Sequence, residues 1–500
     1  MPMSNLASQF DLLSRKADNK SMTTDTAKER SGLRTFLIVW AGQLVSLVGT
    51  SLTAFGLSIF IFQETGSVTQ LAMINLAGLL PRLVLGPFAG ALVDRWDRRS
   101  AMLLSDLGAG VGTLALVGLY YTDNLALWNI MLAVGLSGVF QAFQWPAYQA
   151  AMQVLIPKEQ FSRGSGLVQL AEALGNIGGP VIAGFLIVAG GIGLIFAVDV
   201  ITFLFAVGTL VVVRFPRPAE SKAGAESKGT LWEETKYGFT YLWHRHGLFA
   251  LMIYFAMINL AFGFIMPLFI PLGLSVAGAA ELGTAFAVAA TGMVAGSLVA
   301  STWKGFSHKI AGILIIGGLL GVTMVLVGGR ASIIWIAAIV WLAMSMIPLM
   351  TASSQAVWLS KVEPDLQGRV ASVRLTVAQS MVPIALLLVG PLADNVFEPL
   401  MADGGGLADS IGSIIGTGDG RGYALFFSLL GVVVVVMSAL AWLYKPLRNV
   451  EKDIPDVEVF TAEDETAEGL PDASASTATE KETDELAIDL DADVTHSPAV

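Results

Sequence analysis

The chain contains 500 residues, of which 54% are hydrophobic and only 14% are charged. Soluble domains usually contain about 25% charged residues, so this chain has too few charges to cover a surface that faces water. The composition therefore excludes an ordinary soluble enzyme and indicates a polytopic membrane protein. The net charge of −11 belongs to one tail, because residues 451–500 contain 16 acidic and only two basic residues. The acidity thus implies no basic partner, and no nucleic acid partner, for the remainder of the chain.

Apolar segments long enough to cross a bilayer recur along the chain, since a spanning helix needs about 20 such residues. Twelve segments qualify: Thr35–Phe62, Thr69–Val93, Ser100–Tyr121, Ala126–Gln149, Gly164–Ala189, Gly191–Val213, Leu248–Leu272, Gly283–Trp303, Ile310–Val327, Ser332–Gln355, Val370–Ala393 and Tyr423–Tyr444. The sequence therefore predicts an all-α membrane protein with twelve transmembrane helices in two six-helix halves.

The domain boundaries follow from these segments and from the changes in composition between them. We expect an N-terminal tail over 1–33, a six-helix bundle over 34–213 and a linker over 214–247. A second six-helix bundle follows over 248–444, and the acidic region 445–500 is predicted to be disordered. The linker sequence TLWEETKYGFTYLWHRHG alternates aromatic and charged residues, which indicates an interfacial amphipathic helix. A gating lever remains the alternative for this helix.

The positions of the basic residues predict the orientation in the membrane. One side of the twelve-helix topology holds 25 Lys and Arg residues, and the other holds only Arg330 and Arg421. Basic residues accumulate on the cytoplasmic side, so both termini are expected in the cytoplasm and the protein in the plasma (inner) membrane. The first apolar segment is too long for a cleavable signal peptide.

The loop between the second and third segments reads GALVDRWDRR. It resembles the loop signature of the major facilitator superfamily, with Asp97 where glycine is usual. We interpret Asp97 as tolerated because aspartate adopts left-handed backbone more readily than most residues. Asp94 is positioned to meet the N-terminus of a helix in the facing half, where a carboxylate is favoured. The gating residues expected in this loop are Gly90, Asp94, Arg95, Arg98 and Arg99.

The fifth segment contains GLVQLAEALGNIGGPVIAG, which resembles the antiporter signature of the same superfamily. The matching residues are Gly166, Gly175, Gly179, Pro180 and Gly184. Small residues at four-residue spacing let helices pack closely, and generic packing of this kind is the alternative interpretation. The resemblance implies a proton-coupled exporter.

Ionisable residues inside hydrophobic segments are the candidates for proton coupling, because burying a charge is costly. They are Arg82, Asp106, Glu172, Asp199 and Arg374. Glu172 is the first candidate proton carrier because it shares one helical face with Gln169 and Asn176, and Asp106 is the second. The alternative is a hydrogen-bonded structural acid, which we favour for both Asp106 and Asp199. Arg82 is expected to bind an anionic group of the substrate or to pair with Asp106.

Polar residues on four helices predict the lining of a central cavity. Gln43, Ser46, Thr50 and Thr53 follow helical spacing, and further amides and aromatic residues occur in the fourth, seventh and tenth segments. In the superfamily that the motifs resemble, helices 1, 4, 7 and 10 line such a cavity. Each residue taken singly is also compatible with simple packing. The expected substrate contacts are Arg82, Gln43, Gln141, Gln144, Asn259 and Trp341.

Within the superfamily, the chain is similar to the branch of enterobactin exporters and macrolide-efflux pumps. This resemblance rests on GPFAGALVDRWDRR, FQWPAYQAAMQVLIPKEQ, VDVITFLFA and LQGRVAS. It implies export of a small organic compound, such as a siderophore or a macrolide, by alternating access and proton antiport. A lipid or lysophospholipid transporter of the same fold is the alternative, and a non-transporting membrane sensor or scaffold is a remote one.

Several chemistries are not expected from this sequence. The chain has no G-x4-GK[S/T] loop for ATP and no cysteine, and its four histidines all lie outside the apolar segments. We therefore expect no enzyme activity, no metal site and no cofactor other than the proton gradient. The expected partners are the substrate and the lipid bilayer, with no obligatory protein partner and a monomeric state.

Overall fold

The computed structural model describes residues 4–93, 96–156, 160–213, 215, 231–363 and 366–457. These residues form helices and connecting loops, and none of them lies in a strand. Eleven of the described helices are long and apolar enough to cross a membrane. In lipid, a helix is one of the few structures that satisfy every backbone hydrogen bond internally, which explains the uniform architecture. The predicted all-α fold class is confirmed.

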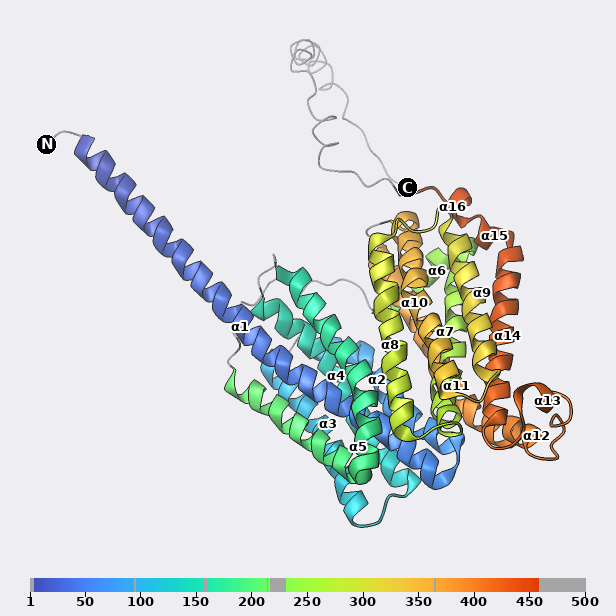
Figure 1. Ribbon diagram of the computed structural model, residues 1–500. Coiled ribbons are helices and arrows are strands. Elements are labelled where there is room, and N and C mark those ends of the chain that lie inside the picture. The colour runs from blue at the N-terminus through green and yellow to red at the C-terminus, as the bar shows by residue number, and fades with distance from the viewer. Residues whose placement is uncertain are drawn as a thin grey trace, which may run out of the picture. The chain divides into compact units, whose positions relative to one another are not determined.

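Five long helices form the first half of the chain (Figure 1). They are α1 (Ser4–Thr65), α2 (Val68–Val93), α3 (Arg98–Tyr121), α4 (Leu127–Leu155) and α5 (Phe161–Val212). The apolar part of α1 that is able to span a membrane is Gly32–Thr65.

Helix α5 contains two of the twelve predicted spans. Its 52 residues would measure about 78 Å as one straight helix, whereas the hydrocarbon core is about 30 Å thick. The helical geometry breaks at Gly190 and Gly191, and Gly191 has φ 68° and ψ −169°, a conformation that essentially only glycine adopts. The break lies where the sequence places the boundary between the fifth and sixth helices, so eleven continuous helices provide twelve spans.

The second half of the chain begins with the short linker helix α6 (Leu231–His244). The long helices that follow are α7 (His246–Leu274), α8 (Ala279–Thr302), α9 (Lys309–Gly328), α10 (Ile333–Lys361), α11 (Gln367–Leu392) and α14 (Arg421–Leu443). A π-helical segment η3 (Ala393–Phe397) continues α11. Short helices are α12 (Glu398–Met401), α13 (Gly412–Ile415), α15 (Lys445–Arg448) and α16 (Val450–Asp453).

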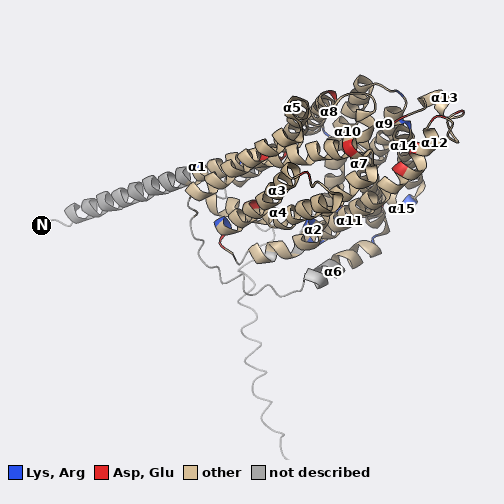
Figure 2. Ribbon diagram, turned by 90° about the horizontal axis from the view of Figure 1, so that it is seen from below, with Lys and Arg blue, Asp and Glu red and all other residues tan. Residues whose placement is uncertain are grey.

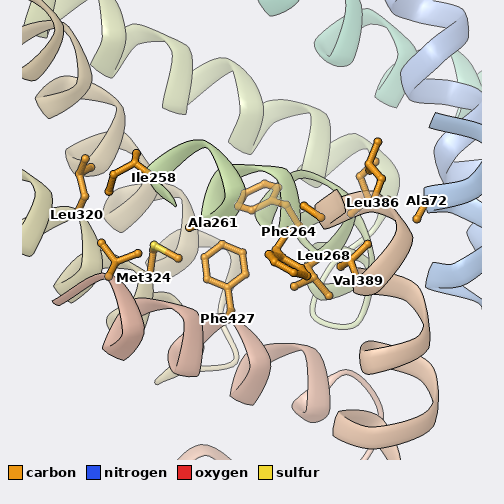
Figure 3. Close-up of a cluster of buried hydrophobic side chains, with 14 of the residues drawn as sticks. Ala72, Ile258, Ala261, Phe264, Leu268, Leu320, Met324, Leu386, Val389 and Phe427 are labelled. Carbon is orange, nitrogen blue, oxygen red and sulfur yellow. The ribbon is translucent and has the colours of Figure 1, made fainter. Parts of the chain in front are cut away.

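Each half packs mainly within itself, and the two halves meet along two seams. In the first half α1 packs against α5 and α4 packs against α2 and α3, while in the second half α9 packs against α14 and α8 against α10. The seams between the halves join α2 to α11 and α5 to α8. Figure 3 shows the apolar core near one seam, where Ala72 of α2 lies near Leu386 of α11.

The outer faces of the helices are apolar. Large hydrophobic side chains remain exposed, among them Val188 (69%), Leu204 (58%) and Leu298 (65%). Charged residues are rare along the spanning helices, which are drawn almost entirely in tan in Figure 2. In water such surfaces would aggregate, whereas in a bilayer they face hydrocarbon.

The linker helix α6 is attached to the second half of the chain, and the predicted amphipathic helix is present. Arg245 forms an ion pair of 3.2 Å with Glu363 and lies 3.8 Å from the ring centre of Tyr241. The Tyr241 hydroxyl also donates to Glu363, and this hydrogen bond, with a contribution from Arg245, holds the pKa of Glu363 below its usual value. Gly238 lies against the backbone of Arg369, which allows α6 to approach α11 closely. These contacts connect α6 to the loop and helix that follow α10.

The prediction of disorder from residue 445 onward is wrong for the first residues of that region. Residues 445–454 form α15 and α16 instead, because Leu447 and Val450 are buried. The carboxylate of Glu451 accepts hydrogen bonds from the backbone N–H groups of Lys309 (2.9 Å) and Ile310 (3.4 Å), which caps the start of α9. The described residues up to Ile454 form one compact unit, and of the residues that follow only 455–457 are described. The remainder of the predicted tail lies outside the described residues.

Replacing Gly191 by alanine should destabilise the protein, because its backbone conformation strains any residue with a Cβ atom. A Cβ at this position has nothing within 4 Å, so the effect reports backbone strain alone. We expect a loss of about 1–3 kcal/mol, measured as a lower apparent melting temperature of the detergent-solubilised protein.

Gly208→Ala is the matched control, since Gly208 lies in the regular part of α5 and a Cβ there also meets nothing within 4 Å. This variant should be neutral or slightly stabilising, because alanine is the better helix former. Equal melting temperatures for Gly191→Ala and Gly208→Ala would contradict the assignment of a break at Gly191.

Candidate functional site

A cavity of about 530 Å³ lies within the first half of the chain, between helices α1 to α5. Its volume falls in the range of about 300–1,000 Å³ that is typical of small-molecule sites. Its polar lining includes the whole predicted stripe of helix 1, which comprises Gln43, Ser46, Thr50 and Thr53. The 3-4-3 spacing of these residues therefore identified the cavity-facing side of α1.

Six of the eight residues predicted for proton coupling and substrate contact meet in this cavity. Gln43, Arg82, Asp106, Gln141, Gln144 and Glu172 all line it. Asn259 and Trp341 are not among its lining residues. Asn259 donates to the carbonyl of Phe255 in its own helix (2.8 Å), and Trp341 donates to the Thr291 hydroxyl of α8 (3.1 Å). Their expected contact with substrate stays a prediction.

Asp106 is the most enclosed polar group of the cavity, with 3% of its surface exposed. One carboxylate oxygen accepts from Gln43 Nε2 (2.8 Å) and the other from Gln144 Nε2 (2.6 Å). Gln144 Nε2 also donates to Gln43 Oε1 (2.8 Å). Helices α1, α3 and α4 thus hold the carboxylate with neutral amides, and within the described part of the chain it has no ion pair. Amide donors orient an acid without cancelling its charge, so the group can still take up a proton or a cation.

A second buried carboxylate, Asp199, lies in the same cavity and is 4% exposed. It accepts from the hydroxyls of Thr53 (2.8 Å) and Thr113 (3.1 Å). Thr113 follows Asp106 by two helical turns, about 10 Å along α3, so the two acids are held at different levels of the cavity. The sequence analysis favoured a structural role for Asp199, and it could not bring together α1, α3 and the second part of α5. The presence of Thr53 in the polar stripe of helix 1 was the available signal.

The remaining charged lining residues are Glu172 and Arg82, and Glu172 is only partly buried. Arg82 does not pair with Asp106, whose two oxygens are bound to the glutamines. The lining therefore contains three carboxylates and one guanidinium. The buried hydroxyl of Tyr148 also has no hydrogen-bond partner among the described residues and lines the cavity. The cavity thus offers acidic groups and at least one unused hydroxyl to a ligand.

The glycine motif of helix 5 lies at two helix contacts. A Cβ on Gly175 would meet Leu47 of α1 at 2.7 Å, and one on Gly179 would meet Ser51 of α1 at 2.4 Å. Gly184 faces the other half, where a Cβ would lie 2.6 Å from the carbonyl oxygen of Ala279 in α8. Gly166 has open space around it, and the carbonyl of Pro180 faces Gly283 of α8. The predicted close packing is present, while its link to antiport stays a prediction.

The loop motif is only partly described, since Asp94 and Arg95 lie outside the described residues. Asp97 has φ −63° and ψ 123° and caps α3 through the backbone N–H of Ser100 (2.9 Å). The left-handed conformation that the sequence analysis offered for Asp97 is therefore wrong, because its side chain works as a helix cap in extended backbone. Arg99 donates to the carbonyls of Leu210 (2.8 Å) and Val211 (2.6 Å).

Two other residues of the loop motif, Gly90 and Arg98, have fewer contacts than Arg99. A Cβ on Gly90 would meet nothing within 4 Å. The Nε atom of Arg98 is buried and has no hydrogen-bond partner in the described part of the chain. Arg99 is therefore the residue of this motif for which the described contacts show an anchoring interaction, with the end of α5.

The solved structures that resemble this chain are those of membrane transporters. A bacterial homologue of the human lysosomal transporter Spinster, in an inward-facing and unoccupied conformation, superposes with a TM-score of 0.63 at 15% identity. The match covers 85% of this chain and 98% of that structure. A bacterial homologue of the iron transporter ferroportin, in an inward-facing state, has a TM-score of 0.56 at 13% identity and matches 81% of this chain and 99% of its own. At such identities the likeness shows the fold alone.

Sequence relatives include several efflux proteins. The macrolide efflux protein A of Streptococcus pyogenes is 26% identical over 367 residues, which are 72% of this chain and 90% of that protein. The multidrug efflux pump Tap of Mycolicibacterium fortuitum is 26% identical over 378 residues, covering 72% and 89%. The enterobactin exporter EntS of Salmonella choleraesuis is 25% identical over 191 residues, covering 37% and 45%.

The two-half helical fold, the apolar outer faces and these relatives agree with the family resemblance of the motifs. A sequence profile of the Major Facilitator Superfamily matches residues 39–386, which include the loop motif, the glycine motif and every lining residue of the cavity. The chain belongs to the major facilitator superfamily of membrane transporters.

Proposed function

We propose that the protein exports amphiphilic organic compounds that carry a basic amine, in exchange for protons that flow inward. The protein would act as a monomer in the plasma (inner) membrane, with both termini in the cytoplasm. The efflux relatives support export. The observation that carries the proposal is the acid excess in the cavity, with three carboxylates against one guanidinium and no ion pair for Asp106 among the described residues.

Charge selects the substrate class in this proposal. Carboxylates enclosed by protein attract a cation more strongly than they would in water, because the surrounding dielectric is low. An amphiphile with one basic amine offers that cation, and its apolar part suits the leucine, valine and aromatic residues of the lining. Macrolides with amino sugars fit this description, whereas an anionic siderophore would meet repulsion from the acids.

The exchange follows from having one acid that binds either of two cations. In the cytoplasm-facing state, the deprotonated Asp106 binds the ammonium group of the substrate. After the halves rock and the cavity opens outward, a proton replaces the substrate on Asp106. With Asp106 neutral, the protein returns to the cytoplasm-facing state and releases the proton into the cytoplasm. Entry of each proton is therefore coupled to the exit of one compound.

The other acids of the cavity have supporting roles in this cycle. Asp199 is bound to Thr113, which lies two turns after Asp106 on α3. It therefore provides a second carboxylate at another level of the same cavity. Glu172, the first candidate from sequence, is more exposed than Asp106 and is better suited to attract cations into the cavity than to hold a proton. The positive charge of Arg82 offsets part of the negative charge of the three carboxylates. It therefore restricts binding to compounds with a small net positive charge.

Asp106→Asn should abolish substrate-dependent proton release in inverted membrane vesicles, because an amide cannot exchange a proton with a cation. Truncating one partner of a buried charge pair costs about 2–5 kcal/mol, so binding of the amine substrate should weaken by about thirtyfold or more. Fluorescence recovery of a pH probe and uptake of a labelled amine give the two measurements. Glu172→Gln should raise KM while leaving the coupling of protons to substrate intact.

Asp403→Asn and Glu64→Gln are the matched controls, since both acids are exposed and lie outside the cavity. Both variants should behave like the parent protein. Normal proton release in Asp106→Asn would contradict the assignment of the carrier, and loss of coupling in Glu172→Gln alone would restore the assignment made from sequence.

The protein should transport an amphiphilic amine faster than the acetamide made from the same compound. We expect the amine to be taken up into inverted vesicles at least about tenfold faster at low concentration, because only the protonated amine pairs with the cavity acids. Asp106→Asn should reduce this preference. Equal transport of both compounds, or transport that is indifferent to an uncoupler, would favour the lipid transporter alternative.

A further inference from the structure

A carboxylate from one half of the protein caps a helix of the other half. Asp394 lies in η3, at the end of α11, and accepts four hydrogen bonds from the first turn of α2. The donors are the hydroxyls of Ser67 and Thr69 (both 2.8 Å) and the backbone N–H groups of Val68 (3.0 Å) and Thr69 (2.9 Å). No other carboxylate among the described residues accepts as many hydrogen bonds.

The interaction satisfies groups that would otherwise lack partners. The first N–H groups of a helix have no acceptor within that helix, and the positive end of the helix dipole favours an anion there. The π-helical turn shifts the direction in which the side chain leaves the helix, and such turns are often associated with function.

The backbones also come into contact at this point. Gly390 lies one turn before Asp394, and a Cβ there would lie 2.3 Å from the Cα of Thr69. At the second seam, a Cβ on Gly283 would lie 3.3 Å from the Cα of Gly184. The start of α2, the end of α11 and the start of α8 belong to one end of the bundle, and the charge distribution predicts that this end faces outward. The extracellular end is therefore the one at which the halves are joined.

We propose that Asp394 is the latch that holds the extracellular side closed, and that it must release α2 each time the cavity opens outward. It is a positioning residue that acts on the equilibrium between two states and does not contact substrate. The loop motif predicts a comparable capping role for Asp94 at the opposite end of α2, towards a helix of the facing half. The consequence for transport rests on the proposed function, while the latch itself does not.

The absence of cysteine in the chain allows the latch to be tested by spin labelling. Thr122→Cys, after α3, and Ala331→Cys, before α10, introduce labels at two exposed positions of the same end in different halves. Pulsed electron paramagnetic resonance on this parent protein in nanodiscs should give mainly short distances. Asp394→Ala should shift the ratio of closed to open populations by about tenfold or more towards long distances, given the usual strength of hydrogen bonds to a charged group.

Three further variants separate a latch from a general loss of structure. Asp403→Asn alters an exposed acid nine residues later in the chain and should leave the distances unchanged. The double variant Ser67→Ala and Thr69→Val removes only the two hydroxyl donors and should give a smaller shift in the same direction, which remains measurable if Asp394→Ala does not fold. Asp394→Glu should restore part of the closed population.

Unchanged distances in a folded Asp394→Ala protein would overturn the latch. A shift in distance without any proton-coupled transport by the parent would leave the latch in place and refute the proposed function. Coupled transport by the parent with unchanged distances in Asp394→Ala and in the double variant would refute the latch and leave the proposed function standing.

Discussion

Hydrocarbon cannot form hydrogen bonds, and this constraint governs the rest of the structure. Backbone groups that would otherwise face hydrocarbon need partners within the protein, so the described part of the chain is almost wholly helical. The buried acids are held by neighbouring side chains. Asp106 takes amide donors and Asp199 takes hydroxyl donors from helices that are distant in sequence. Because these donors are neutral, both acids are oriented and retain their ability to bind a cation.

Glycine determines where the two halves approach each other. Gly184 and Gly283 bring α5 against α8, and Gly390 brings α11 against the start of α2. Close backbone contact at these points leaves little room for water, whereas the polar cavity lies deeper within the first half. Glycine contacts allow close packing, and because no large side chains interlock there, the two helices can also separate easily.

The sequence predicted the fold well, because length and hydropathy are local properties. The spans, the division into halves and the boundary between the fifth and sixth segments follow from apolar runs, and the structure places the break at Gly190 and Gly191. The lining of the first half was also predictable, since Gln43 and Thr53 share a helical face. Residues 445–454 were not, because their order depends on the contact of Glu451 with α9 and on the burial of Leu447.

By itself, the sequence determined the class of protein, its family motifs and the list of acids inside the membrane. Only the tertiary structure decided which of those acids share a cavity and that Asp394 caps α2. It also decided that Asp106 is bound by two glutamines and not by Arg82. These outcomes depend on contacts between residues 38 to 327 positions apart, for which hydrophobic periodicity carries no information. A helix face can be predicted from spacing, but its partner is determined by packing of the whole bundle.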